Sequence, residues 1–150
     1  MINRLTRIHV SSFLLAVLSA GCGKALPPIV PVEGVVILEG KPLPNVEVRL
    51  IPMIDRGAEC IARGVTDRDG RFILTCRGQP GAYACENHVL VREAEIPAHL
   101  KSENAQAALA TYLQGLAGRP LPEQYASLAD NPLTIHVTAD KQEYQIKLLR

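Results

Sequence analysis

Four cysteines are the residues of this 150-residue chain whose side chains could most readily do covalent chemistry. Cys22 follows Leu18 and three small residues, so a peptidase could cut just before it and leave its thiol beside a new amino terminus. The thiol could then carry a diacylglyceryl group and the amine a fatty acid such as palmitate. Each buried CH₂ contributes about 0.8 kcal/mol, so two or three chains would hold the protein at a membrane.

The residues before Cys22 have the three-part organisation of an export signal. Arg4 and Arg7 supply positive charge, and residues 10–18 (VSSFLLAVL) form an apolar run that is too short for a spanning helix, which needs roughly 20 residues. With Cys22, this segment resembles the lipobox of bacterial lipoproteins. The resemblance predicts a helical signal peptide over residues 1–21 and lipidation at Cys22, and a plain secretory signal is the alternative.

The resemblance also predicts location and domain organisation. An exported lipoprotein would face the periplasm or the cell surface. Gly23 stands where an aspartate would retain a lipoprotein in the inner membrane, which favours the outer membrane. Residues 22–31 are rich in proline and predict a stiff, extended tether. Residues 32–149 remain for one domain.

Composition narrows the classes of partner. Removal of residues 1–21 takes away two of the 16 basic residues and none of the 15 acidic ones, which leaves a net charge of about −1. A nearly neutral chain gives no electrostatic reason to expect nucleic acid as a partner. The expected partners are membrane lipid through the acyl anchor, and an envelope protein or a surface polymer. The chain has no phosphate-binding loop and no Gly-x-Ser-x-Gly motif, so we expect no cofactor and no enzyme activity.

The other three cysteines could form a disulfide in an oxidising compartment. We expect one bridge and one free thiol, because three cysteines remain once Cys22 is acylated. Pairing outward from a turn at residues 67–70 places Cys60 and Cys76 on adjacent strands, which favours that bridge. Cys85 is the alternative partner. The leftover thiol is the one candidate nucleophile, and an unreactive structural thiol is the simpler interpretation.

Asp67 and Asp69 could begin a calcium-binding loop, because they stand in an Asp-x-Asp-Gly sequence. Such a loop needs a bidentate glutamate at its twelfth position, which here is Gly78. We therefore expect these aspartates to stabilise a tight turn, with calcium as the weaker hypothesis. The histidines of this part of the chain show no metal-ligand spacing; they are His88, His99 and His136. The first and last are expected in solvent, because they fall opposite apolar rows.

The domain alternates apolar and polar residues with a period of two, which is typical of half-buried strands. Seven strands are expected, at residues 32–38, 46–51, 61–66, 71–76, 88–92, 133–138 and 143–148. Turn sequences at residues 67–70 and 139–142 predict two hairpins, one from the third and fourth strands and one from the last two. This pattern indicates an all-β, seven-stranded antiparallel Greek-key sandwich.

A helical insert interrupts this pattern before the last two strands. Ser102 can cap a helix over residues 103–117, which Gly118 and Pro120 would end. An apolar stripe on this helix comprises Leu109, Tyr112, Leu113 and Leu116. We therefore expect one short surface helix docked on the sandwich.

Several segments together resemble the carboxypeptidase regulatory-like domain, which has a transthyretin-like (prealbumin-like) sandwich. They are residues 32–36 (VEGVV), 40–48 (GKPLPNVEV), 66–72 (TDRDGRF), 121–125 (LPEQY) and the closing strands at 133–149. The chain departs from the usual pattern at Cys76, Cys85 and the helical insert. The resemblance implies a non-catalytic, lipid-anchored module of the cell envelope that mediates protein or surface interactions. A small-ligand carrier of the transthyretin-like type is the alternative.

Overall fold

The computed structural model describes residues 25–54, 58–114, 121–129 and 131–150. The predicted signal peptide, Cys22 and residues 115–117 of the predicted helix lie outside the described residues. Within the described ranges, no helix has both the length and the apolar character that crossing a bilayer requires.

The described chain is mostly β-strand, and its largest element is a six-stranded antiparallel sheet, here called the large sheet. Its strands run in the order β11 (Thr134–His136), β10 (Glu86–Glu93), β4 (Val46–Pro52), β5 (Ala62–Val65), β7 (Thr75–Cys76) and β8 (Gln79–Pro80). Strands β10 and β4 form its centre and pair along seven residues, from Asn87 opposite Pro52 to Glu93 opposite Val46. Both present buried valine or leucine side chains at alternate positions, as the sequence period requires.

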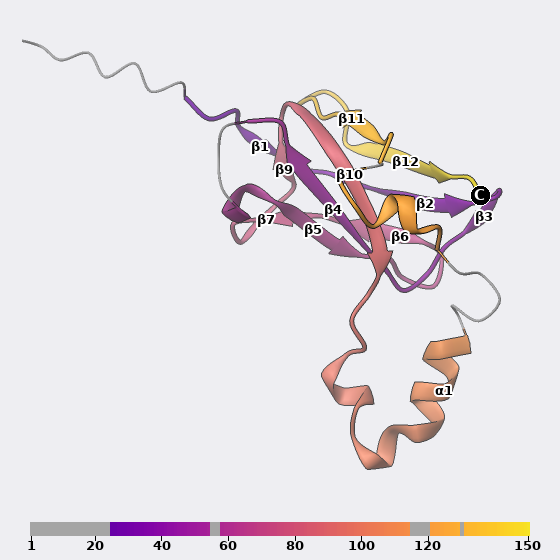
Figure 1. Ribbon diagram of the computed structural model, residues 1–150. Coiled ribbons are helices and arrows are strands. Elements are labelled where there is room, and N and C mark those ends of the chain that lie inside the picture. The colour runs from indigo at the N-terminus through magenta and orange to yellow at the C-terminus, as the bar shows by residue number, and fades with distance from the viewer. Residues whose placement is uncertain (1–24, 55–57, 115–120, 130) are drawn as a thin grey trace, which may run out of the picture.

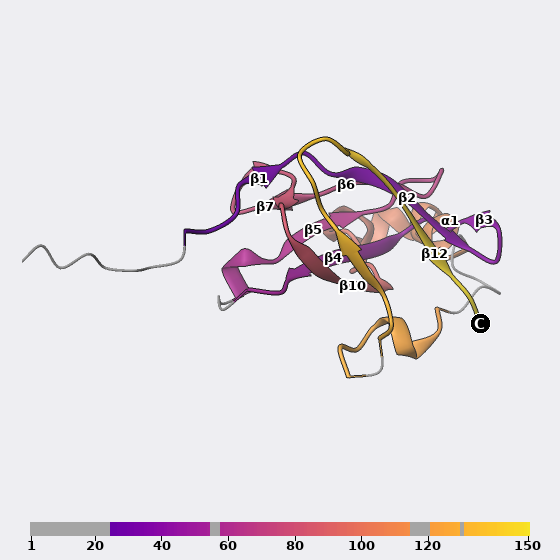
Figure 2. The same cartoon turned by 90° about the horizontal axis from the view of Figure 1, so that it is seen from above.

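A second sheet, here called the small sheet, lies against the large one (Figures 1 and 2). Strand β2 (Glu33–Leu38) is central to it and pairs with β12 (Glu143–Leu148) on one side and with β6 (Arg71–Ile73) and β3 (Lys41–Pro42) on the other. The β12–β2 pair is parallel, so the expectation of a purely antiparallel sandwich was wrong at this place. A short ribbon of β1 (Ile29–Val30) and β9 (Ala82–Tyr83) completes the described strands.

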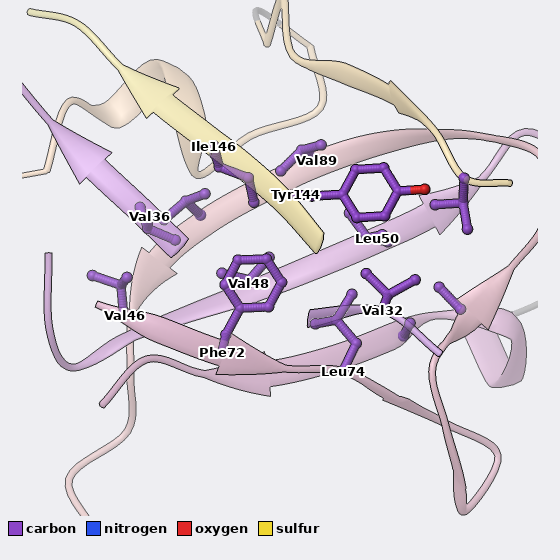
Figure 3. Close-up of a cluster of buried hydrophobic side chains, with 14 of the residues drawn as sticks. Val32, Val36, Val46, Val48, Leu50, Phe72, Leu74, Val89, Tyr144 and Ile146 are labelled. Atoms are coloured by element: carbon purple, nitrogen blue, oxygen red, sulfur yellow. The ribbon is translucent and has the colours of Figure 1, made fainter. Parts of the chain in front are cut away.

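The core fills the space between the two sheets (Figure 3). Val48, Leu50 and Val89 come from the large sheet and face Val36 and Ile146 from the small sheet. All five are buried, and full burial of such a side chain contributes about 1.5–3 kcal/mol. This shared core is what holds the two sheets together as a sandwich.

The predicted hairpin over residues 61–76 was wrong in its strand pairing. The turn forms, but β6 pairs with β2 in the small sheet, and only Thr75 in β7 pairs with Arg63 in β5. Leu74 marks the crossing between sheets, because its N–H donates to the carbonyl of Val32 at 3.0 Å. Alternate residues of this segment still point into the core. Its backbone forms hydrogen bonds first with the small sheet, through β6, and then with the large sheet, through β7.

The predicted hairpin of the last two strands was also wrong. Strand β11 pairs with β10 in the large sheet, whereas β12 pairs with β2 in the small sheet. A single bridge between Thr138 and Lys141 is what remains of the turn. The chain here passes from one layer of the sandwich to the other, because both strands must turn an apolar face inward.

The insert projects from the end of the sandwich, below the sheets in Figure 1. It contains η2 (Ala98–Leu100), η3 (Glu103–Ala105) and α1 (Gln106–Gln114), and α1 has no buried residue. The expectation that Ser102 caps the helix was wrong, since its hydroxyl donates to the carbonyl of His99 at 3.2 Å. The preceding 3-10 turn brings that carbonyl within reach. A hydrogen bond from Asn45 Nδ2 to the carbonyl of Tyr112, at 3.3 Å, ties α1 to the sandwich.

Gly34 allows the small sheet to pack closely at its centre. A Cβ atom at this position would lie 2.1 Å from the carbonyl oxygen of Tyr144 and 2.9 Å from the ring of Phe72. No side chain can occupy that space, so β2 needs glycine here for β12 and Phe72 to approach it.

Candidate functional site

Cys60 and Cys76 lie together inside the sandwich, where the structure has both as thiols. Cys60 ends η1 (Ala58–Cys60), Cys76 ends β7, and the Cys76 thiol donates to the carbonyl of Cys60 at 3.4 Å. Burial raises the pKa of Cys76, and the nearby Cys60 adds to the rise. The structure therefore brings the predicted pair together, while the disulfide itself stays a prediction.

Cys85, the alternative partner, lies between β9 and β10 and is half-buried. Burial raises the pKa of its thiol, although hydrogen bonds from Met53 and Asn87 oppose the rise. The Asn87 side chain also donates to the carbonyl of Cys85 at 2.8 Å, which fixes the bend that leads into β10. The location of Cys85 is thus that of a structural thiol in a packed corner.

Asp67 and Asp69 occupy the tight turn that the sequence predicts. Asp67 Oδ1 accepts the N–H of Asp69 and the N–H of Arg71, both at 2.9 Å. Gly70 takes a positive φ of 71° and closes the turn. In the described part of the chain, no group of three or more His, Cys, Asp or Glu side chains could hold a metal ion. Calcium at this turn stays a prediction.

The structure brings His88 and His136 onto neighbouring strands of the large sheet. Glu86 pairs with His136 and His88 pairs with Thr134, so both imidazoles lie on the outer face. The expectation that His88 is fully solvated was wrong, since it is half-buried and its Nδ1 is enclosed without a hydrogen-bond partner among the described residues. Spacing along the chain could not predict this proximity, because it arises from strand pairing.

The same outer face carries a charged network that the sequence did not single out. The carboxylate of Glu47 accepts hydrogen bonds from Arg92 Nε at 2.6 Å and from Arg49 Nη2 at 3.0 Å. Burial raises the pKa of Glu47, but the two arginines more than offset it and hold the pKa below its ordinary value. Arg63 lies directly opposite Arg49 on β5. In the sequence, only the alternation of apolar and polar residues bears on this network. It predicts that these side chains face outward, but it does not predict their contacts.

A cavity of about 630 Å³ lies between the insert and the end of the sandwich, and we call it the insert cavity. Pro44, Asn45 and Arg68 line it from the sandwich; His99, Leu100, Ala108, Thr111 and Tyr112 line it from the insert. The guanidinium of Arg68 and the imidazole of His99 therefore share this cavity with apolar side chains such as Leu100. This arrangement suits an anionic ligand with an apolar body.

Tyr112 stands at the boundary of this cavity. Its hydroxyl is enclosed without a hydrogen-bond partner among the described residues, and burial raises its pKa, with Glu93 contributing. The sequence predicted that Tyr112 lies on an apolar stripe of the helix, and it showed no metal-ligand spacing for His99. Only the folded insert brings both residues beside Arg68, so the site could not be found from spacing.

A second cavity, of about 380 Å³, lies where the chain crosses between β5 and β6. Val65 and Ile73 line it, and these are among the most exposed large apolar side chains of the described residues, at 55% and 65%. Charged groups border it at Glu33, Asp67 and Arg71.

Comparison with family models, with curated proteins and with solved structures finds no match to this chain.

Proposed function

We propose that this chain is a lipid-anchored, non-catalytic β-sandwich module of a bacterial cell envelope. Residues 1–21 would direct export, and acylation of Cys22 would hold the mature chain at a membrane. The observation that carries this proposal is the placement of the tether and the insert at opposite ends of β10.

Two strand relationships define this placement. The end of the predicted tether (residues 22–31) forms strand β1, which pairs with β9, and β9 directly precedes the start of β10. The insert follows Glu93, at the other end of β10. Eight strand residues span about 26 Å at the usual rise per residue. A membrane at the tether would therefore leave the insert and its cavity on the distal side, where a partner can reach them (Figure 1).

The strand arrangement supports the finer assignment to a seven-stranded Greek-key sandwich of the carboxypeptidase regulatory-like type. The longer strands divide into β2, β6 and β12 on one side and β4, β5, β10 and β11 on the other. The remaining strands contain two residues each: β3, β7 and β8 add to these two sheets, and β1 and β9 pair with each other. We propose this topology as the reason for the sequence resemblance.

The side-chain contacts favour a binding role over a catalytic one. Across the described residues, no hydroxyl or thiol group is hydrogen-bonded to a histidine, which is the usual means of activating such a nucleophile. The most buried thiol, Cys76, has a raised pKa, so little of it is thiolate at neutral pH.

Metabolic labelling with a palmitate analogue tests the anchor. Wild-type full-length chain expressed in bacteria should carry the label and sediment with membranes, whereas Cys22→Ser should lose the label and leave the membrane fraction. Cys85→Ser removes a different cysteine and should keep both properties. An unlabelled wild-type chain, or a labelled Cys22→Ser chain, would overturn the proposal.

The insert cavity favours a second candidate function, the binding of a small anionic molecule with an apolar body. The dye 1-anilinonaphthalene-8-sulfonate has this chemistry, and its fluorescence should rise on mixing with the folded protein. Ala108→Trp fills the cavity and should abolish the rise, while Ala107→Trp places the same side chain at an exposed helix position outside the cavity lining and should preserve it. Equal fluorescence from both variants would remove this candidate.

A further inference from the structure

Strand β12 has a neighbour on one side only. It ends the small sheet, where its partner is β2, and no other strand of the described chain pairs with its opposite edge. No proline interrupts its six residues, EYQIKL. An uninterrupted edge strand is a template for pairing with another strand.

The hydrogen bonds to β2 identify which peptide groups face the open edge. The carbonyl of Gln142 accepts the N–H of Glu33, and the carbonyl of Leu148 accepts the N–H of Glu39. Even-numbered residues of β12 therefore direct their backbone toward β2. Because this direction alternates along a strand, the peptide groups of Glu143, Gln145 and Lys147 point away from the sheet. None of them has a hydrogen-bond partner among the described residues.

Two tyrosine hydroxyls close the open edge at its ends. At one end, Tyr125 bonds both the N–H and the carbonyl of Leu149. At the other, Tyr144 donates to the carbonyl of Lys141 at 3.0 Å and accepts the N–H of Thr138. The free part of the edge is thus confined to residues 143–147.

The side chains along this free edge are complementary to themselves. Glu143, Gln145 and Lys147 are all exposed on the outer face of the small sheet. In an antiparallel pair of two β12 strands centred on Gln145, each Glu143 stands opposite a Lys147 of the other copy, and the two glutamines face each other. Arg71 Nη1 lies 3.8 Å from the Glu143 carboxylate at an exposed position, which leaves that carboxylate accessible.

Other registers fit less well. A shift by two residues in one direction places Lys147 opposite Lys141, a like-charge pair. A shift in the other direction places Glu143 opposite Leu149, whose peptide groups are already bonded to Tyr125. The centred register is the one that pairs all three free residues and both charges.

We propose that two copies of this chain associate through β12, in antiparallel register about Gln145, so that the small sheet continues across a two-fold axis. Each of the three free residues then donates and accepts one backbone hydrogen bond with the other copy. The interface is isologous, as a two-fold requires. The proposal stands on strand geometry and is independent of acylation at Cys22.

Cysteine cross-linking of the full-length chain in detergent, with a copper oxidant, tests the register. Gln145→Cys should give a cross-linked dimer on a non-reducing gel, because residues opposite each other in such a pair are within disulfide reach. Glu143→Cys alone and Lys147→Cys alone should each give about a fifth of that yield or less. In this register the introduced cysteine lies several residues along the strand from the same cysteine of the other chain. A mixture of these two variants should recover about half of it through mixed dimers.

Charge exchange gives a second, independent measurement. Glu143→Lys and Lys147→Glu each place like charges across the pair and should weaken association roughly tenfold in sedimentation experiments. The double exchange restores opposite charges and should restore association.

Wild-type chain treated with the copper oxidant is the control for the cross-linking experiment, because it shows how much dimer forms through the natural cysteines.

Three results would overturn the proposal. Gln145→Cys could cross-link no better than Glu143→Cys. The double charge exchange could associate as weakly as the single variants. Tagged and untagged copies expressed together could fail to co-purify, which would leave a strand of another protein as the occupant of this edge.

Discussion

The hydroxyl of Tyr125 makes two hydrogen bonds to the backbone of one residue, Leu149. It accepts the Leu149 N–H at 3.0 Å and donates to the Leu149 carbonyl at 2.9 Å. Tyr125 is buried at the end of η4 (Glu123–Tyr125), 24 residues before its partner. The contact fastens the end of β12 to the segment that enters the large sheet, so it joins the two layers outside the apolar core.

Tyr125→Phe should destabilise the fold while preserving the packing of the ring. The variant leaves the N–H and the carbonyl of Leu149 without their partner, and the expected loss in the free energy of unfolding is about 1–3 kcal/mol. Urea denaturation followed by circular dichroism measures it. Tyr83→Phe is the matched control, because the Tyr83 hydroxyl has only a 3.5 Å contact with Arg77 and its loss should matter little. Equal effects from both variants would contradict the role given to Tyr125.

Gly34→Ala should be far more damaging than the same change at Gly40. The new Cβ at residue 34 would lie 2.1 Å from the carbonyl oxygen of Tyr144, so β12 would have to move away from β2. At Gly40 the Cβ meets nothing within 4 Å, and the cost is the positive φ of 80°, about 1–2 kcal/mol. Thermal unfolding should show the Gly40 variant folded with a lowered Tm and the Gly34 variant mostly unfolded. A Gly34 variant as stable as the Gly40 variant would contradict this account of the packing.

The sequence predicted which side chains enter the core better than which strands pair. Phe72, Leu74 and Cys76 are buried at alternate positions, as the period of two requires. That period depends only on local backbone geometry. The backbone partner of β6 depends on where β2 lies in the assembled sandwich, and no local pattern encodes it. The same separation of local and non-local information explains why the last two strands were assigned to a hairpin.

Sequence patterns predicted the candidate site only in part. They predicted the turn around Asp67 and the proximity of Cys60 and Cys76, because both depend on residues near one tight turn. They did not predict the insert cavity, which Arg68 and His99 line from segments about 30 residues apart. They also missed the Glu47 network, since a contact between β4 and β10 is invisible until the register is known.

Glu47→Gln should lower stability at neutral pH and have little effect in acid. The folded-state pKa of Glu47 lies below its ordinary value of 4.5, so the ionised carboxylate stabilises the fold. That contribution is fully present above the ordinary pKa and is lost as pH falls through the lowered, folded-state pKa. The expected loss at pH 7 is about 1–2 kcal/mol, because the hydrogen bonds are charged but only part-buried. Denaturant titrations at pH 7 and pH 3 measure the difference.

Glu39→Gln is the control for this pH dependence. Glu39 and Arg150 are 3.6 Å apart and about half-exposed, and such pairs contribute about 0–1 kcal/mol. The two variants should therefore diverge at pH 7 and approach wild type as the pH falls through the lowered pKa of Glu47. A loss at Glu47 that persists at low pH would show that packing of the side chain, rather than its charge, is responsible.

Oxidation of the purified protein should link Cys60 to Cys76. Both side chains are buried side by side, and the Cys76 thiol already contacts the carbonyl of Cys60. Closing this segment of the chain should add about 3 kcal/mol to the free energy of unfolding. Peptide mapping by mass spectrometry without reductant identifies the bond, and denaturation with and without reductant measures its effect. In the reduced protein, the raised pKa of Cys76 predicts slow alkylation at pH 8 until denaturant is added.

Cys85→Ser separates this bond from the alternative pairings. Because Cys85 lies in the corner before β10, its removal should leave the Cys60–Cys76 link and the effect of the reductant unchanged. Loss of the disulfide in this variant would assign Cys85 as a bridging residue. Alkylation of all three cysteines in denaturant without reductant would show that the sandwich keeps its thiols, and the stabilisation would then come from burial of Cys60 and Cys76 alone.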